Sequence, residues 1–156
     1  MNILAIDPGN EKSAWLNLME NHQNPQYPIF IFDIMENESL IDNIKLIYTI
    51  ENLICVIEMV ASYGMPVGKT IFETCLWIGK FVRQCEICGI KTELVYRRDI
   101  KLHFCNSARA KDSNIRQVLL DRYGKEATKG IKKDIWQALA IATYWRDKHF
   151  KDAKEL

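Results

Sequence analysis

Three acidic residues lie far apart in the sequence, and each occurs where the chain is expected to hold it rigidly. Asp7 and Glu58 each end a run of four apolar residues, and Asp134 opens a stretch of helical character. Because an unpaired carboxylate is costly to bury, three such groups at the ends of ordered elements indicate a shared counter-ion. A divalent metal ion that supports hydrolysis is the natural candidate.

Oxygen ligands favour Mg²⁺ or Mn²⁺ over zinc. In this interpretation Asp7 bridges two Mg²⁺ ions about 4 Å apart, Glu58 holds one of them, and Asp134 closes the site from a helix N-terminus. Pro8-Gly9 turns the chain sharply, so that backbone can approach a phosphate. Taken alone, each acid also has a structural explanation, as a turn residue, an edge charge or a helix cap. Their combination favours the metal site.

The elements that must position these acids can be predicted from apolar patterning. Consecutive or alternating apolar residues predict five strands, at 2–7, 13–19, 28–35, 53–59 and 91–96. Capping residues and helical periodicity predict four helices, at about 39–52, 70–88, 112–123 and 133–149. This order predicts a mixed α/β fold in one domain, residues 1–156. Three antiparallel strands form its front, parallel strands follow, and helices flank the sheet.

Charge and composition narrow the functional classes. The net charge is only +1, but basic residues gather in the second half of the chain, where they can form a nucleic-acid-binding face or simply solvated helix faces. No apolar run is long enough to span a membrane, so we expect a cytoplasmic protein. Cys85 and Cys88 form a CxxC pair with His103 and Cys105 downstream. Buried thiols explain these residues better than a zinc site, because Cys85 continues an apolar helical stripe.

The acids and the basic segments together resemble the RuvC family of Holliday junction resolvases, in the ribonuclease H-like superfamily, and especially its compact phage members. The segments that carry the resemblance occur in order along the chain: 3–9, 56–58, 78–80, 98–101, 110–112, 115–117 and 138–142. The resemblance implies a ribonuclease H-like fold and a cytoplasmic setting in a bacterial or phage-infected cell. It implies Asp7, Glu58 and Asp134 as catalytic metal ligands.

The same resemblance implies a homodimer through the helix at 70–88, rather than a helix buried only in its own core. Two copies would nick opposing strands of a four-way junction symmetrically. The residues expected to contact DNA are Arg98, Lys101, Lys111, Arg116, Lys132 and Lys133.

The chain departs from the family pattern at two positions. A second metal-site acid normally follows the first by three residues, and here that position is the neutral Gln137, which leaves an amide or water as the fourth ligand. An aromatic wedge often follows the second acid by three residues, and here that position is Ala61. Tyr63 is the nearest aromatic residue that can stack on an unpaired base, or it is an ordinary loop residue.

Other functions stay open on the sequence alone. Gln137 motivates a branched-DNA-binding module with weak catalysis. The same fold can also serve a nuclease acting on RNA–DNA hybrids or on replication forks. A nucleotide-binding protein of the actin-like fold shares the strand-Asp-Gly opening, but this chain is too short for two such lobes.

Overall fold

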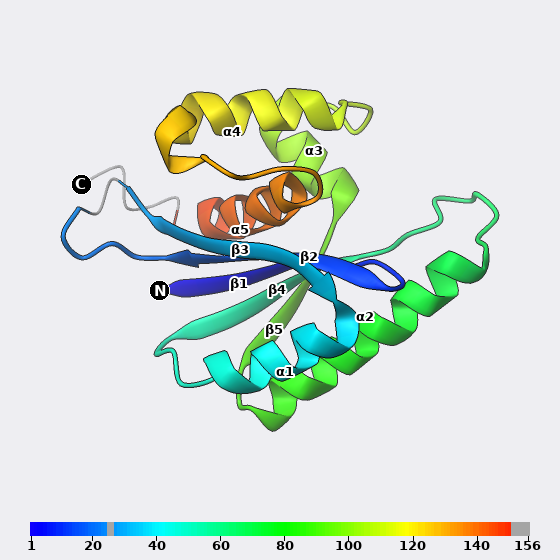
Figure 1. Cartoon of the computed structure of the whole chain (residues 1–156). Coiled ribbons are helices and arrows are strands. Elements are labelled where there is room, and N and C mark those ends of the chain that lie inside the picture. The colour runs from blue at the N-terminus through cyan, green and yellow to red at the C-terminus, as the bar shows by residue number, and fades with distance from the viewer. Residues whose placement is uncertain (25–26, 151–156) are drawn as a thin grey trace.

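A five-stranded mixed sheet forms the centre of the protein (Figure 1). The computed structural model describes residues 1–24 and 27–150, so the last six residues of the predicted domain lie outside it. The strands are β1 (Asn2–Asp7), β2 (Lys12–Met19), β3 (Ile29–Glu36), β4 (Leu53–Met59) and β5 (Lys91–Tyr96). Their order across the sheet is β3-β2-β1-β4-β5.

The strand directions confirm the predicted arrangement. β1 pairs antiparallel with β2, and β2 pairs antiparallel with β3. β4 pairs parallel with β1 on one side and with β5 on the other. The three inner strands β2, β1 and β4 are covered on both faces, which explains why their apolar residues are consecutive rather than alternating.

Helices cover both faces of this sheet. They are α1 (Asn37–Ile47), α2 (Lys69–Ile87), α3 (Arg97–Cys105), α4 (Asp112–Ala127) and α5 (Ile135–His149). Figure 1 shows α3, α4 and α5 on one side of the sheet and α1 and α2 on the other. None of the helices in the described ranges combines the length and apolar character needed to cross a membrane.

Two separate cores hold the helices to the sheet. On one face α5 is buried nearly all round, because it lies between the strands and the helices α3 and α4; its Ala138–Ala142 segment is fully inaccessible to solvent. On the other face α2 contributes Ile78, Phe81 and Cys85 to a core shared with α1 and β4. Cys85 is therefore a buried thiol, as expected, and it packs in the same core as Cys55.

Three elements differ from the predictions. The sequence analysis missed α3, because Ile100 is the only one of its nine residues that is fully buried, so no apolar stripe marks the helix. The first helix ends at Ile47, five residues earlier than predicted. The fourth helix continues to Ala127 rather than ending at Tyr123, but Gly124 breaks its regular geometry with φ 79°.

Candidate active site

Asp7 and Glu58 lie side by side at one edge of the sheet. Ile6 of β1 is paired with Ile57 of β4 in a parallel register, so the next residue on each strand emerges at the same level. The two side chains are only 16% and 13% exposed. The adjacency predicted from the strand ends is therefore present in the fold.

The turn after Asp7 is held by its own hydrogen bonds. The Gly9 carbonyl accepts a hydrogen bond from Asn37 Nδ2 (2.9 Å), and the Gly9 amide donates one to Ser13 Oγ (3.2 Å). Ser13 Oγ in turn donates to Asn37 Oδ1 (2.6 Å). A Cβ atom at position 9 would lie 2.2 Å from the Lys12 carbonyl oxygen, so only glycine fits. The glycine requirement comes from this close backbone approach within the turn, which fixes the end of β1.

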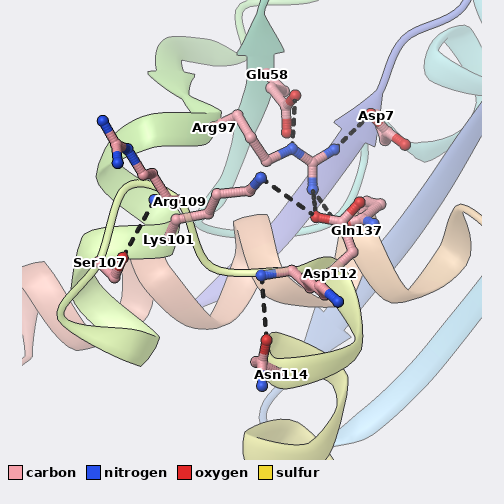
Figure 2. Close-up of polar contacts among 10 residues, drawn as sticks. Asp7, Glu58, Arg97, Lys101, Ser107, Arg109, Asp112, Asn114 and Gln137 are labelled. Carbon is pink, nitrogen blue, oxygen red and sulfur yellow. Dashed lines mark hydrogen bonds and ion pairs between the residues drawn. The ribbon is translucent and has the colours of Figure 1, made fainter.

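A guanidinium group that the sequence analysis missed stands among the acids (Figure 2). Arg97 donates from Nε to Glu58 Oε1 (3.1 Å), and its Nη2 lies 3.7 Å from Asp7 Oδ1. Its Nη1 donates to Gln137 Oε1 and lies 3.9 Å from Asp112 Oδ1. One cationic side chain therefore contacts acceptors from β1, β4, α4 and α5.

Burial and mutual repulsion make the two strand acids hard to ionise. Burial is the largest cause that raises the pKa of Asp7 to about 8; the charge of Glu58 adds to it, and Arg97 partly offsets it. Burial also raises the pKa of Glu58, against the charge and hydrogen bond of Arg97. Glu58 Oε2 is fully buried and finds no hydrogen-bond partner in the described part of the chain.

These features fit a divalent cation. An unpartnered carboxylate oxygen and two crowded, desolvated acids are what a hard metal ion with oxygen ligands would stabilise. In residues 1–24 and 27–150, however, no three His, Cys, Asp or Glu side chains converge closely enough to hold a metal. The Arg97 guanidinium stands between the groups that would have to converge.

Asp134 and Gln137 lie at the start of α5, beside the strand acids. Asp134 is the N-cap residue and is exposed, and its negative charge is one of the smaller causes that raise the pKa of Asp7. Gln137 is half-buried, and its amide oxygen faces Arg97. The structure thus brings all four predicted metal-site residues to one region, where Gln137 accepts a hydrogen bond from Arg97.

The predicted DNA-contacting residues divide into two groups. Lys101 of α3 lies among the acids of the site, because its Nζ is 3.9 Å from Asp112 Oδ1. The others are exposed around the site: Arg98 on α3, Lys111 and Arg116 at the start of α4, Lys132 and Lys133 before α5, and Tyr63 in the β4–α2 loop. Tyr63 is 61% exposed in the loop that follows Glu58, where its backbone has φ 47°.

Arg97 and Asp112 are the two residues near the acids that sequence reasoning left out. A signal for Arg97 was present, because β5 lies next to β4 and Tyr96 is level with Met59. Any residue directly after β5 must therefore emerge close to Glu58. Asp112 was interpreted only as a helix start, and its position depends on how α4 packs against α3, which the sequence does not specify.

Comparison with solved structures identifies the architecture. A structure of RuvC from Thermus thermophilus is similar to this chain with a TM-score of 0.73, 13% sequence identity, and coverage of 96% of this chain and 97% of that one. The chain has the RuvC fold. The T. thermophilus RuvC in complex with a Holliday junction substrate is similar with a TM-score of 0.72 and 12% identity over 92% of each chain.

More distant is the Fowlpox virus resolvase in complex with Holliday junction DNA, with a TM-score of 0.52, 11% identity, and coverage of 96% of this chain and 99% of that one. No family model and no curated protein sequence matches the chain. The RuvC resemblance inferred from short motifs is therefore confirmed at the level of the fold.

Proposed function

We propose that this protein is a divalent-metal-dependent DNA endonuclease that resolves four-way junctions by symmetric nicking. The observation that carries the proposal is the pair of buried acids, Asp7 and Glu58, at the ends of adjacent parallel strands in a RuvC fold. The similar structures of T. thermophilus RuvC and the Fowlpox virus resolvase, each in complex with Holliday junction DNA, support the choice of substrate. The protein would act on branched DNA during recombination or repair in the cytoplasm of a bacterial or phage-infected cell.

Asp7, Glu58 and Asp134 would hold the metal, with Gln137 as a further oxygen ligand. Mg²⁺ is the expected ion, with Mn²⁺ able to substitute, and two ions per site remain the prediction from the sequence. When bound, the ions would activate a water molecule and stabilise the leaving oxygen of the phosphodiester. The burial of Asp7 and Glu58 would keep bulk water away from the reacting phosphate.

The exposed basic residues around the acids would position the DNA backbone. Phosphate contacts set affinity and register and carry little sequence information. The residues proposed for this role are Arg98, Lys101, Lys111, Arg116, Lys132 and Lys133. Arg116 also contacts α5, because its guanidinium lies 5.0 Å from the ring centroid of Trp136, the second residue of that helix. Tyr63 would stack on a base unpaired at the crossover.

A homodimer through α2 would supply the symmetry that paired nicking needs. Phe72 and Leu76 are 60% and 69% exposed, one helical turn apart on the face opposite the buried Ile78, Phe81 and Cys85. Exposed apolar side chains at helical spacing are typical of a helix with a second partner. Two copies related by a two-fold axis would present two active sites to opposing strands.

The test is cleavage of a synthetic four-way junction, labelled on each strand in turn, with Mg²⁺ or with EDTA. Asp7→Asn, Glu58→Gln and Asp134→Asn should each abolish nicking while junction binding persists. Paired nicks in opposing strands that require both metal and the acids are the expected result. A variant that nicks at the wild-type rate would remove its residue from the site, and equal cutting of forks, flaps or RNA–DNA hybrids would refute the junction selectivity.

A second function has one specific observation in its favour. Among residues 1–24 and 27–150, Asp7 and Glu58 contact Arg97 and no three metal-binding side chains converge, and Gln137 provides a neutral amide instead of a fourth acid. A junction-binding module without catalysis would keep this arrangement. Tight junction binding without nicks in either Mg²⁺ or Mn²⁺ would support that function over the nuclease.

A further inference from the structure

Arg97 makes unusual contacts for a residue beside a metal site. Its guanidinium bonds to Glu58 Oε1 and lies near Asp7 Oδ1, and these are oxygens that a metal ion would need. Side-chain contacts hold it from four elements of the fold, and it is 24% exposed. A metal ion and a guanidinium are both cations, so the two compete for the same carboxylate oxygens.

The Nη1 side of the Arg97 guanidinium faces Asp112, so the side chain can move away from Asp7 and Glu58 in that direction. Its Nη1 is bonded to the neutral amide of Gln137 and lies 3.9 Å from Asp112, whose side chain is 55% exposed. Lys101 Nζ lies 3.9 Å from the same Asp112 oxygen, so Asp112 already contacts a second cationic side chain. A rotation of the Arg97 side chain toward Asp112 would bring the guanidinium to the surface between α3 and α4.

That surface carries the residues proposed to contact phosphates. Lys111 and Arg116 are exposed at the start of α4, beside Asp112. A guanidinium released there can bind a phosphate with two parallel hydrogen bonds, a geometry that a lysine cannot reproduce. Arg97 therefore has one set of partners in the metal-free protein and a second available set on bound DNA.

We propose that Arg97 is an exchange cation: without metal it occupies oxygens of Asp7 and Glu58, and it moves to a DNA phosphate when a divalent cation binds these acids. Metal binding and DNA binding are then coupled through one side chain. This inference rests on the proposed metal-dependent nuclease function. It adds a substrate-binding residue to that function and predicts a thermodynamic linkage that an ordinary structural ion pair would not produce.

The chain contains a matched control. Arg98 follows directly on α3, is exposed, and has none of the acidic partners of Arg97. Arg97→Ala and Arg98→Ala therefore remove the same charge from neighbouring positions. Arg97→Gln serves as a second variant that retains hydrogen-bonding capacity, and thermal melts of all variants would establish that they fold.

The first measurement is Mn²⁺ binding to the DNA-free protein by isothermal titration calorimetry. A unit charge a few ångströms from a bound ion opposes it strongly even at an intermediate dielectric constant, so we expect Arg97→Ala and Arg97→Gln to bind Mn²⁺ about tenfold more tightly than wild type. Arg98→Ala should stay within about twofold, because its charge is outside the cluster and screened by solvent. Unchanged or weaker Mn²⁺ binding in both Arg97 variants would overturn the proposal.

The second measurement is the affinity for a fluorescent four-way junction, in EDTA and in Ca²⁺ at equal ionic strength. In wild type we expect Ca²⁺ to tighten junction binding by about fivefold or more, the size of a typical coupling between two sites. Arg97→Ala should lose most of this gain. Arg98→Ala should weaken binding by the same factor in both buffers.

Equal Ca²⁺-dependent gains in wild type and Arg97→Ala would refute the exchange, even if the protein is a nuclease. Failure of wild type to bind either Mn²⁺ or the junction would instead refute the proposed function, so the two failures can be told apart.

Discussion

Asp7→Asn should make the protein more stable in the absence of metal while it removes the proposed nuclease activity. The carboxyl group of Asp7 has a pKa of about 8 in the folded protein, chiefly because it is buried and then because Glu58 is close, against 3.8 without these surroundings. Folding therefore takes up a proton. Without metal, the free energy of unfolding must fall as the pH rises from about 4 to about 8 and then level off.

The size of the effect follows from these two pKa values. At about 1.36 kcal/mol per pH unit, the loss of stability between pH 3.8 and pH 7 is roughly 4 kcal/mol. Asparagine has nearly the same shape and no charge, so it should recover much of this loss. Because its amide must also be desolvated and loses the attraction of Arg97, we expect a net gain of about 2 kcal/mol at pH 7. For a chain of this size that raises the melting temperature by roughly 4 to 8 °C.

Urea denaturation in EDTA between pH 5 and pH 9 would measure this gain. The control is Asp134→Asn, because Asp134 is exposed and its replacement should change stability by no more than about 0.5 kcal/mol. Adding Mg²⁺ should stabilise wild type and leave Asp7→Asn unchanged, since a ligand stabilises only the state that binds it. If Asp7→Asn is no more stable than wild type at pH 8, burial does not raise the pKa of Asp7 as described.

Three further perturbations test other parts of the molecule. Leu76→Glu, on the exposed face of α2, should convert the proposed dimer to a monomer in light scattering without unfolding the single copy, since Leu76 is 69% exposed there. Tyr63→Ala should slow junction nicking at least severalfold with unchanged stability and dimerisation, as measured by single-turnover cleavage. Asp147→Asn should cost about 2 to 3 kcal/mol in denaturant melts, because the carboxylate bonds to Arg122 at 2.6 Å through both oxygens and to His103 at 2.8 Å. Burial opposes the ionisation of Asp147, but these hydrogen bonds outweigh it and lower the pKa of the carboxyl group. Wild type should therefore lose this stability as the pH falls below about 3.8, whereas Asp147→Asn should show no such loss.

The parts of the fold that the sequence predicted are those set by local patterning. Residues 2–7 and 53–59 are recognisable as buried strands because both of their faces are apolar, and an acid is the last residue of the first and the penultimate residue of the second. Once these strands are parallel neighbours, Asp7 and Glu58 must lie together. Local patterning also predicted the long helix after Gly68 and the apolar helix after Asp134. Their observed ends lie within two residues of the predicted ones.

The parts that escaped prediction depend on neighbours distant in sequence. The nine residues of α3 have little apolar character, so the helix owes its position to packing against α4 and α5. Arg97 looked like one more basic residue beside Arg98, although one is held among acids and the other is exposed. The difference arises because β5 pairs with β4, which turns the first residue of α3 toward Glu58.

Gln137 and Arg97 are best understood as one feature of the site rather than two departures from a pattern. A carboxylate at position 137 would form a full ion pair with Arg97 Nη1, in addition to those with Asp7 and Glu58. Such a third ion pair would make the guanidinium costly to remove. A neutral amide satisfies the same N–H group with a hydrogen bond whose loss costs far less. Arg97 can then occupy oxygens of Asp7 and Glu58 when no metal is bound and give them up to a divalent cation at a lower cost.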